Sequence, residues 1–236
     1  MLIAGAEKLG LSLNSGQLEQ FETVYKELID WNQRMNLTSI TDYEGVQIKH
    51  FLDSLTVTLA LRQPLNERTR IMDIGTGAGM PGLPLKIAFP HIRLTLLDAT
   101  AKKATFLHHI TDKLGLDNVK IVVGRAEEIA HKEEYREKYD VVLGRGVARL
   151  ATLVELTLPF CATGGGLIAQ KKEPLKTELS QASQAIGLLG GELREVMGIN
   201  MQEFSDERRL IIIDKMSATP EQYPRRPGIP AKNPLG

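Results

Sequence analysis

Apolar residues recur at helical spacing through the first part of the chain. From residue 15 to residue 31 they predict one amphipathic helix, with Ser15 as its capping residue. The polar stretch 31–38 predicts a connection, a second helix is predicted from about Asp42, and Pro64 ends the helical pattern. Because no strand-like alternation interrupts these residues, we expect 1–66 to form a helical segment that packs on the rest of the protein.

Strand-like and helical patterns alternate after residue 67. The predicted strands are 70–74, 92–97, 119–123, 139–143 and 166–170, and the helices between and after them are about 81–88, 101–115, 149–161 and 174–189. Such alternation forms right-handed βαβ units and a parallel sheet. Glu192–Met197 and Arg208–Asp214 have no helix between them, so we expect them to pair antiparallel. Residues 67–215 are therefore predicted to be a doubly wound, Rossmann-like α/β domain with five parallel strands and an antiparallel C-terminal hairpin.

Residues 216–236 differ in composition from the rest of the chain. They hold five of the eleven prolines, together with Arg225, Arg226 and Lys232. Because proline lacks the amide proton that helices and central strands require, we expect neither element in this tail. The tail is then either an extended arm lying on the body of the protein or a segment that becomes ordered on a partner.

The composition limits the class of protein. Lysine and arginine together number 29, as do aspartate and glutamate, so a nucleic-acid partner would have to be met by a local basic patch. Cys161 is the single cysteine, which excludes a disulfide within the chain and fits a reducing compartment. The N-terminus lacks the pattern of a signal peptide, and no apolar stretch has membrane-spanning length. These features predict a cytoplasmic protein without membrane contact.

A glycine-rich loop follows the first predicted strand. It contains Gly75, Gly77, Gly79 and Gly82. Backbone N–H groups at the start of the next helix, whose first turn is expected to include Pro81, are free to bind a nucleotide-like ligand. The G-x-G-x-x-G spacing also matches dinucleotide sites, but Asp73 before the loop would repel a pyrophosphate and attract a cationic amino group. The segment therefore resembles the first motif of S-adenosylmethionine-dependent methyltransferases, with a nicotinamide-dependent oxidoreductase as the alternative.

Polar residues also follow the next three predicted strands, at the edge where a doubly wound sheet binds ligands. Asp98 ends the second strand about 20 residues after the loop, where an acid on the ribose hydroxyls is expected, although a cap for the helix at 101 would also explain it. The Ala126 N–H group and the Glu127 carboxylate follow the third strand and could bind the adenine edge. Residues 144–149 follow the fourth strand, where a transferred methyl group would project.

The methyl acceptor is inferred by elimination. No Asn/Asp-Pro-Pro-aromatic motif follows the fourth strand, which disfavours methylation of an exocyclic amine by that arrangement. Methylation of pyrimidine carbon 5 needs a cysteine nucleophile, and Cys161 lies in an apolar, helix-like stretch as a small buried residue. A ring nitrogen such as guanine N7 has an exposed lone pair and needs alignment rather than a general base. Guanine N7 is therefore the favoured acceptor.

Matches to one known family run along most of the chain. They comprise Trp31–Asn32, Asn36–Thr38, His50–Leu55, Asp73–Lys86, Leu97–Asp98, Lys102–Lys103, Phe106–Leu107, Gly124–Glu127, Arg145, Val147–Ala148, Glu207–Arg208 and Tyr223–Leu235. Together they resemble the bacterial ribosomal RNA small-subunit methyltransferase G family, formerly called glucose-inhibited division protein B. The resemblance implies a class I methyltransferase fold with an N-terminal helical extension. It also implies S-adenosylmethionine-dependent N7 methylation of a guanine in small-subunit (16S) ribosomal RNA.

The resemblance and the loop together give a set of candidate cofactor residues. They are Asp73, Gly75, Gly77, Met80, Asp98, Ala126, Glu127 and Arg145. Arg145 is also the candidate for positioning the substrate. Met80, Gly144 and Gly146 depart from the Phe, Ser and Ala that are common in the family. Met80 keeps an apolar contact, whereas the two glycines loosen the loop after the fourth strand.

Basic residues near the strand ends and in the tail are the candidates for RNA binding. They are Arg145, Arg149, Lys171, Lys172, Arg208, Arg209, Arg225, Arg226 and Lys232. Such residues contact phosphates and position the substrate without reading its sequence. His50 and Asn36 are expected to be interior hydrogen-bonding residues. We expect a monomer that acts on small-subunit ribosomal RNA or the 30S particle without a metal, and a non-catalytic ribosome-assembly factor is the non-enzymatic alternative. Truncation after Asp214 is expected to weaken substrate binding more than cofactor binding.

Overall fold

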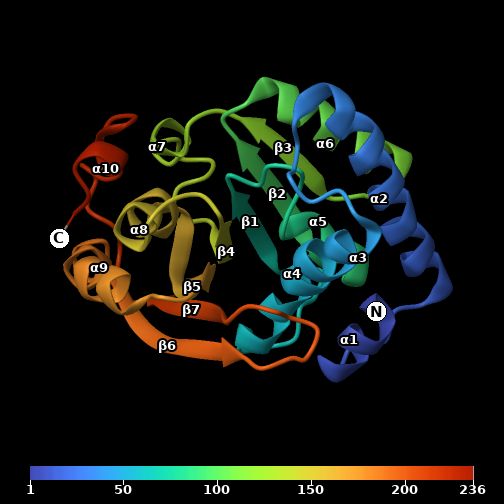
Figure 1. Cartoon of the computed structure of the whole chain (residues 1–236). Helices are drawn as coiled ribbons and strands as arrows, with labels where there is room; N and C mark the ends of the chain where they lie inside the picture. The colour runs from blue at the N-terminus through green and yellow to red at the C-terminus, as the bar shows by residue number, and fades with distance from the viewer. Residues whose placement is uncertain (236) are drawn as a thin grey trace.

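A mixed seven-stranded sheet forms the centre of the molecule in a computed structural model that describes residues 1–235 (Figure 1). Its strands are β1 (Arg70–Ile74), β2 (Arg93–Asp98), β3 (Val119–Val123), β4 (Tyr139–Arg145), β5 (Cys161–Lys172), β6 (Gly191–Ile199) and β7 (Arg208–Lys215). Their order is β3-β2-β1-β4-β5-β7-β6. The first five strands run parallel and β7 pairs antiparallel with β5 and β6. The predicted fold class, five parallel strands plus an antiparallel hairpin, is confirmed.

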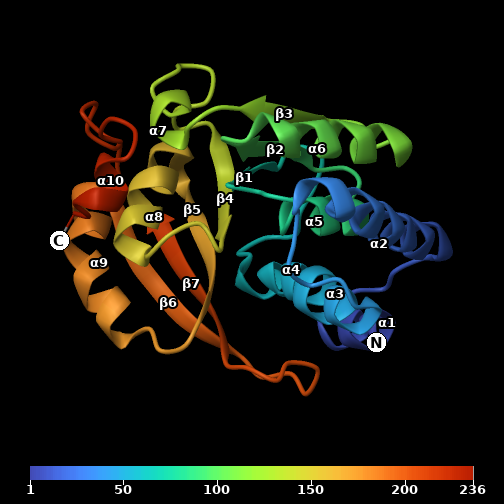
Figure 2. The same ribbon diagram turned by 45° about the horizontal axis from the view of Figure 1, so that its top comes forward.

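Helices cover both faces of the sheet (Figure 2). They are α5 (Gly82–Ala88) and α6 (Ala101–Lys113) on one face, and α8 (Leu150–Thr157) and α9 (Lys176–Leu188) on the other. Ile71 of β1 packs in the core of the first face, and its neighbour Met72 packs in the core of the second. Neighbouring residues in a strand point to opposite faces, so a strand buried on both sides is apolar throughout.

The start of β5 differs from the prediction. The helical pattern 149–161 ends with α8 and a 3-10 turn, η3 (Leu158–Phe160), and Cys161 is the first residue of β5 rather than a helical residue. The sequence did not indicate this start of the strand, because the glycines Gly164–Gly166 give no alternation of apolar and polar side chains. A Cβ at Gly165 would lie 2.5 Å from the Asp140 carbonyl oxygen, and one at Gly166 would lie 2.6 Å from that of Ile213. These close approaches of neighbouring strands require glycine.

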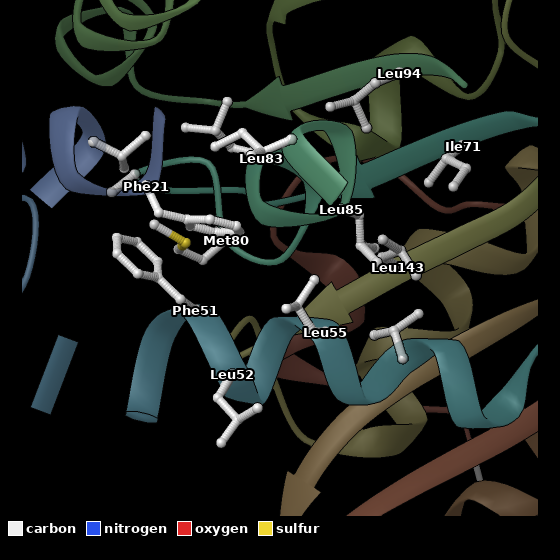
Figure 3. Packing of buried hydrophobic residues seen from close by; sticks show 14 of the residues in the cluster. Phe21, Phe51, Leu52, Leu55, Ile71, Met80, Leu83, Leu85, Leu94 and Leu143 are labelled. Carbon is white, nitrogen blue, oxygen red and sulfur yellow. The ribbon is translucent and has the colours of Figure 1, made fainter. Parts of the chain in front are cut away.

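The N-terminal helices pack on the face of the sheet that carries α5. They are α1 (Leu2–Lys8), α2 (Ser15–Met35), α3 (Tyr43–Val46), the π-helix η1 (Gln47–Leu52), α4 (Asp53–Leu55) and the 3-10 helix η2 (Thr56–Ala60). Phe21 and Phe51 contact each other with ring centroids 5.1 Å apart and lie against Met80 of the glycine-rich loop (Figure 3). The loop therefore packs on residues from two separate N-terminal helices, α2 and η1.

Two details of α2 correct the sequence prediction. Its N-cap is Asn14, whose side chain accepts a hydrogen bond from the Gln17 N–H group while the Gln17 side chain accepts from the Asn14 N–H group. This capping box leaves Ser15 as the first helical residue. The helix also continues past Trp31 to Met35, so the predicted connection begins later, at Asn36. Asn36 adopts the left-handed conformation with φ of 51° and is exposed, which makes the prediction of an interior role wrong.

Two short helices were not predicted, α7 (Ala126–Ile129) after β3 and α10 (Ile229–Lys232) in the tail. The tail was predicted to lack any helix, and α10 shows this to be wrong. Its Pro230 lies in the first turn, where the missing N–H group costs no hydrogen bond. The tail lies along α7 and α8 in both views (Figures 1 and 2). Within residues 1–235, no helix combines the length and apolar character needed to cross a membrane.

Candidate functional site

The glycine-rich loop after β1 exposes bare backbone at the carboxyl edge of the sheet. Gly77 has φ of +61°, and a Cβ there would meet no atom closer than 4.0 Å. Gly75 has φ of +64°, and a Cβ there would lie 2.8 Å from Val147 in the loop after β4. Glycine is therefore required at Gly75 both by the left-handed backbone and by the contact between the two loops.

Asp73 ties this loop to the start of α5 from beneath. One carboxylate oxygen, Oδ2, accepts hydrogen bonds from the Thr76 hydroxyl at 2.6 Å and the Gly82 N–H group at 2.9 Å. The other, Oδ1, is buried with no hydrogen-bond partner among the described residues. Burial raises the pKa of Asp73 to about 6, against the opposing effects of Thr76 and Gly82. A buried, unpartnered carboxylate oxygen fits a ligand with a cationic amino group. Pro81 is the N-cap residue of α5 and not part of its first turn.

Asp98 connects the loop to the end of β2. It accepts a hydrogen bond from the Gly77 N–H group at Oδ2, 3.0 Å, and from the Thr100 N–H group at Oδ1, 2.9 Å. The helix cap considered from the sequence is not formed, because the N-cap residue of α6 is Thr100 and no side chain caps this helix. The second bond is instead a contact that fixes the turn before α6. It does not exclude a ligand role, because each carboxylate oxygen can accept a further bond. Asp98 is only 6% exposed and faces a cavity.

A cavity of about 180 Å³ lies beside Asp98. It is lined by the ends of the first three strands and the loop after β4, including Gly75, Ala126, Glu127, Val147 and Ala148. Its wall also contains Thr152 and Leu156 of α8 and, from the tail, Pro230 and Ala231. We call it the strand-end cavity. Four predicted cofactor residues, Gly75, Asp98, Ala126 and Glu127, are thus brought together around one space.

Glu127 is nearly buried, and its carboxylate is already engaged within the chain. Its Oε1 accepts hydrogen bonds from the Arg125 guanidinium and from the Gly228 N–H group of the tail, both at 3.0 Å. Burial alone would raise the pKa of Glu127, but these two donors, the backbone N–H group of Glu127 and the charge of Arg125 together hold the pKa below its usual value. Glu127 is therefore an ionised acceptor held in place by the tail.

Arg145 lies outside the strand-end cavity, in a second hollow. Its Nη1 donates to the Lys49 carbonyl and to Asp53 Oδ2, both at 3.0 Å, and Nη2 lies 3.3 Å from His50 Nδ1. Asp53 Oδ1 also lies 2.5 Å from Nη1 of Arg208. Burial, followed by the charge of Arg145, lowers the pKa of His50 to about 4, so His50 is neutral at pH 7. Its Nε2 is 2.8 Å from the Thr38 hydroxyl, in agreement with the hydrogen-bonding role expected from the sequence.

The second hollow, of about 320 Å³, gathers basic residues from four elements, and we call it the basic cavity. Its charged and polar lining comprises Lys49, His50, Asp53, Arg145, Gln170, Lys171, Lys172, Arg208 and Arg209. Five of the residues predicted to bind RNA are among these. Some are paired within the chain, such as Lys171 with Glu178 at 2.7 Å and Arg209 with Glu173 at 2.9 Å. Arg208 is 6% exposed and pairs with Asp53 and Asp206, so its guanidinium mainly stabilises the wall of the basic cavity.

The remaining predicted residues lie elsewhere. Met80 is buried in the core beneath the loop rather than in the cavity wall. Arg149, Arg226 and Lys232 are exposed. Arg225 was predicted to bind RNA, but its guanidinium binds the buried carboxylate of Glu155, with Nη2 2.7 Å from Oε2. Cys161 is fully buried, and burial raises its pKa to about 12, which removes it as a nucleophile.

Asp53 and the tail residues Pro230 and Ala231 are site residues that sequence reasoning missed. A signal for Asp53 was present, because a carboxylate within the apolar run of Phe51, Leu52 and Leu55 needs a buried partner. The tail residues lie within the family match Tyr223–Leu235, but that match did not connect them with the strand-end cavity. A further hollow, of about 710 Å³, lies at the amino ends of the parallel strands beside Arg70 and Gly166. Doubly wound sheets bind ligands at the opposite edge, so we do not assign the site there.

The sheet order, the glycine-rich loop and the acidic strand ends define a class I methyltransferase. A solved S-adenosylmethionine-dependent methyltransferase from Aquifex aeolicus shares this fold with a TM-score of 0.55 at 13% identity, over 75% of this chain and 96% of that one. A family model described as rRNA small subunit methyltransferase G matches residues 17–211. The chain belongs to this family.

Curated relatives extend the match over nearly the whole chain. A ribosomal RNA small subunit methyltransferase G from Dehalococcoides mccartyi (strain CBDB1) is 53% identical over 99% of this chain and 98% of its own length. One from Brevibacillus brevis is 45% identical over 96% and 94%. The predicted family, the enzyme class and the S-adenosylmethionine cofactor are confirmed, and the oxidoreductase alternative is set aside.

The raised pKa of Asp73 gives a pH-dependent prediction for cofactor binding. A cationic amino group beside Oδ1 favours the ionised carboxylate, so binding must expel the proton below about pH 6. We expect affinity for S-adenosylhomocysteine to rise about tenfold between pH 5 and pH 7. Calorimetry in buffers of different ionisation enthalpy measures the released proton. Asp73→Asn is expected to flatten the profile, and a wild-type profile without slope would contradict the assignment.

Ionisation of Asp73 also affects the stability of the unliganded fold, and in the opposite direction: as pH rises, ligand affinity increases while the stability of the fold decreases. Because the folded-state pKa of Asp73 lies above its unfolded value of 3.8, the stability associated with the protonated carboxyl is fully present below pH 3.8. It is lost as pH rises through about 6 in the unliganded protein. Arg145 and Asp98 act on Asp73 in opposite directions, Arg145 lowering and Asp98 raising its pKa. Because affinity rises and stability falls over the same pH range, the effect of Asp73 on ligand binding can be distinguished from its effect on folding.

Proposed function

We propose that this enzyme transfers the methyl group of S-adenosylmethionine to N7 of a guanine in small-subunit ribosomal RNA. The supporting observation is the placement of the two cavities on either side of the loop after β4. Val147 and Ala148 of this loop line the strand-end cavity, and Arg145 and Gly146 line the basic cavity. A cofactor on one side and a nucleotide on the other would meet at this loop.

The residues of the strand-end cavity suit the parts of the cofactor. Asp98 can accept the ribose hydroxyls, and the Ala126 N–H group and Glu127 can bind the adenine edge. Asp73 is fully buried next to the cavity rather than in its lining, and its unpartnered Oδ1 is the acceptor proposed for the amino group. When bound, S-adenosylmethionine supplies an electrophilic methyl group on sulfur. Glycine backbone at Gly75 and Gly77 lets a ligand approach without obstruction by side chains.

The basic cavity suits an acceptor that needs no general base. Asp53 is paired with two guanidinium groups, and His50 is held between Thr38 and Arg145. Guanine N7 donates its lone pair to the methyl carbon as the carbon–sulfur bond breaks, and no proton leaves the ring nitrogen. Arg145 would position the base or its phosphate, and lysines and arginines at the rim would bind the RNA backbone. With a ribosomal substrate, we place the enzyme in the cytoplasm, acting as a monomer without a metal.

The test is a methyl-transfer assay followed by mapping of the product. Purified enzyme and tritiated S-adenosylmethionine are incubated with unmodified small subunits or with protein-free 16S ribosomal RNA. We expect label in the RNA and one strand break after borohydride and aniline treatment, which cleaves at 7-methylguanine. Label without cleavage would indicate another acceptor atom. Cofactor binding without any label would favour the non-catalytic assembly factor.

A further inference from the structure

The C-terminal tail is bonded to the body through hydrogen bonds from side chains that follow α7 to carbonyl groups of the tail. Arg136 donates from Nη2 to the Thr219 carbonyl at 2.8 Å and from Nη1 to the Tyr223 carbonyl at 2.9 Å. His131 Nε2 lies 2.8 Å from the Pro224 carbonyl oxygen. These contacts fix residues 219–224 against the segment that follows α7.

The strongest anchor is the buried carboxylate of Glu155 on α8, which is 0% exposed. It accepts three hydrogen bonds from Arg225 alone, from the backbone N–H and Nε at 2.9 Å each and from Nη2 at 2.7 Å. One turn earlier on α8, the Thr152 hydroxyl donates to the Pro230 carbonyl at 2.9 Å. Removing the tail would take away the charge partner of the buried Glu155 carboxylate, so the tail is needed to stabilise this part of the body.

Beyond this anchor the tail reaches the strand-end cavity. The Gly228 N–H group donates to Glu127 Oε1 at 3.0 Å, and Pro230 and Ala231 form part of the cavity wall. Gly228 has φ of +82°, which glycine adopts without strain, and it turns the chain into α10. Asp98 and Ala126 line the same cavity from the sheet side. The tail thus supplies both a donor to a site carboxylate and an apolar surface.

We propose that the C-terminal tail is a structural part of the cofactor site. In it Gly228 positions Glu127, and Pro230 and Ala231 pack on the adenosine end of the ligand. The inference rests on the proposed placement of the cofactor in the strand-end cavity. A flat, weakly polar purine suits the small apolar surface of a proline and an alanine. This reverses the sequence-based expectation, because loss of the tail is now expected to affect the cofactor first.

The main test uses substitutions within the tail, because truncation also removes Arg225, the partner of the buried Glu155. Ala231→Phe places bulk in the cavity wall, and Ala218→Phe adds the same ring at an exposed tail position outside the cavity. We expect Ala231→Phe to raise the dissociation constant for S-adenosylhomocysteine about tenfold, and that for adenosine by the same factor. Ala218→Phe is expected to bind both ligands like the wild type. Thermal unfolding of both variants is measured alongside.

A positioning role differs from a purely structural one in the kinetics. Ala231→Phe is expected to raise KM for S-adenosylmethionine while kcat on unmodified small subunits stays within about twofold, because the substituted wall touches only the adenosine end. Truncation after Lys215 provides the second variant, and we expect it to lose S-adenosylhomocysteine binding. Full affinity in either Ala231→Phe or the truncated chain would overturn the proposal. If the wild type itself fails to bind S-adenosylhomocysteine, the cofactor placement fails instead.

Discussion

Arg145→Ala is expected to lower kcat for RNA methylation by about 100-fold or more, with little change in S-adenosylhomocysteine affinity or thermal stability. Arg145 lines the basic cavity, outside the strand-end cavity, and is held there by the Lys49 carbonyl and Asp53. Its removal takes away the guanidinium that would align the acceptor. The fold survives because Asp53 keeps its ion pair with Arg208 and is not left as an unpaired buried charge.

The measurement is single-turnover methyl transfer to unmodified small subunits at saturating cofactor. Arg34→Ala, which removes an exposed arginine of α2, is the matched control and is expected to behave like the wild type. Arg145→Lys keeps the charge but loses the two-pronged geometry, so we expect an intermediate rate. Unchanged turnover in Arg145→Ala would remove Arg145 from the site. A selective loss of S-adenosylhomocysteine affinity would move it to the cofactor.

Asp98→Ala is expected to weaken S-adenosylhomocysteine binding by about 10- to 100-fold, because a hydrogen bond to a charged group contributes about 1.5–3 kcal/mol. The substitution removes the carboxylate that we propose as acceptor for the ribose hydroxyls, and it also frees the Gly77 N–H group that Asp98 holds. Both losses act on the same edge of the strand-end cavity. Asp98→Asn retains an acceptor without the charge, and we expect a smaller loss of affinity.

Calorimetric titration measures this affinity, with Asp117→Ala as the matched control. Asp117 is exposed and lies before β3, away from the strand-end cavity. Asp98 also accepts a hydrogen bond from the Thr100 N–H group before α6, so a loss of thermal stability is expected in addition. If stability falls while S-adenosylhomocysteine affinity is unchanged, the helix-start contact accounts for Asp98 and the ribose role is wrong.

Local sequence patterns were sufficient to predict the sheet and the strand-end residues of the site. Apolar runs separated by helical patterns gave seven strands, six of them within two residues of their observed bounds. Right-handed crossovers bring the ends of the parallel strands to one edge. Gly75, Asp98 and Glu127 could therefore be grouped before any coordinates, because each follows a strand directly. Where side-chain alternation is missing, as at Gly164–Gly166, the pattern gave the wrong start of β5.

The basic cavity and the tail contacts were determined by packing between segments that are distant in the sequence. Arg145 is placed by Asp53, 92 residues earlier, and Arg225 by Glu155, 70 residues earlier. The tail reaches Glu127 across 101 residues. Charge and composition alone suggested that Arg225 binds RNA, because they do not reveal a buried carboxylate on another helix.

The sequence by itself thus determined the order of elements, the glycine-rich loop and the acidic strand ends, because each depends on neighbouring residues and on the chirality of strand connections. The tertiary structure alone decided which charges are paired, which cavity each side chain faces and that the tail lines the strand-end cavity. These outcomes depend on the burial of polar groups, and a buried charge takes whichever partner the packed helices and strands bring within hydrogen-bonding distance.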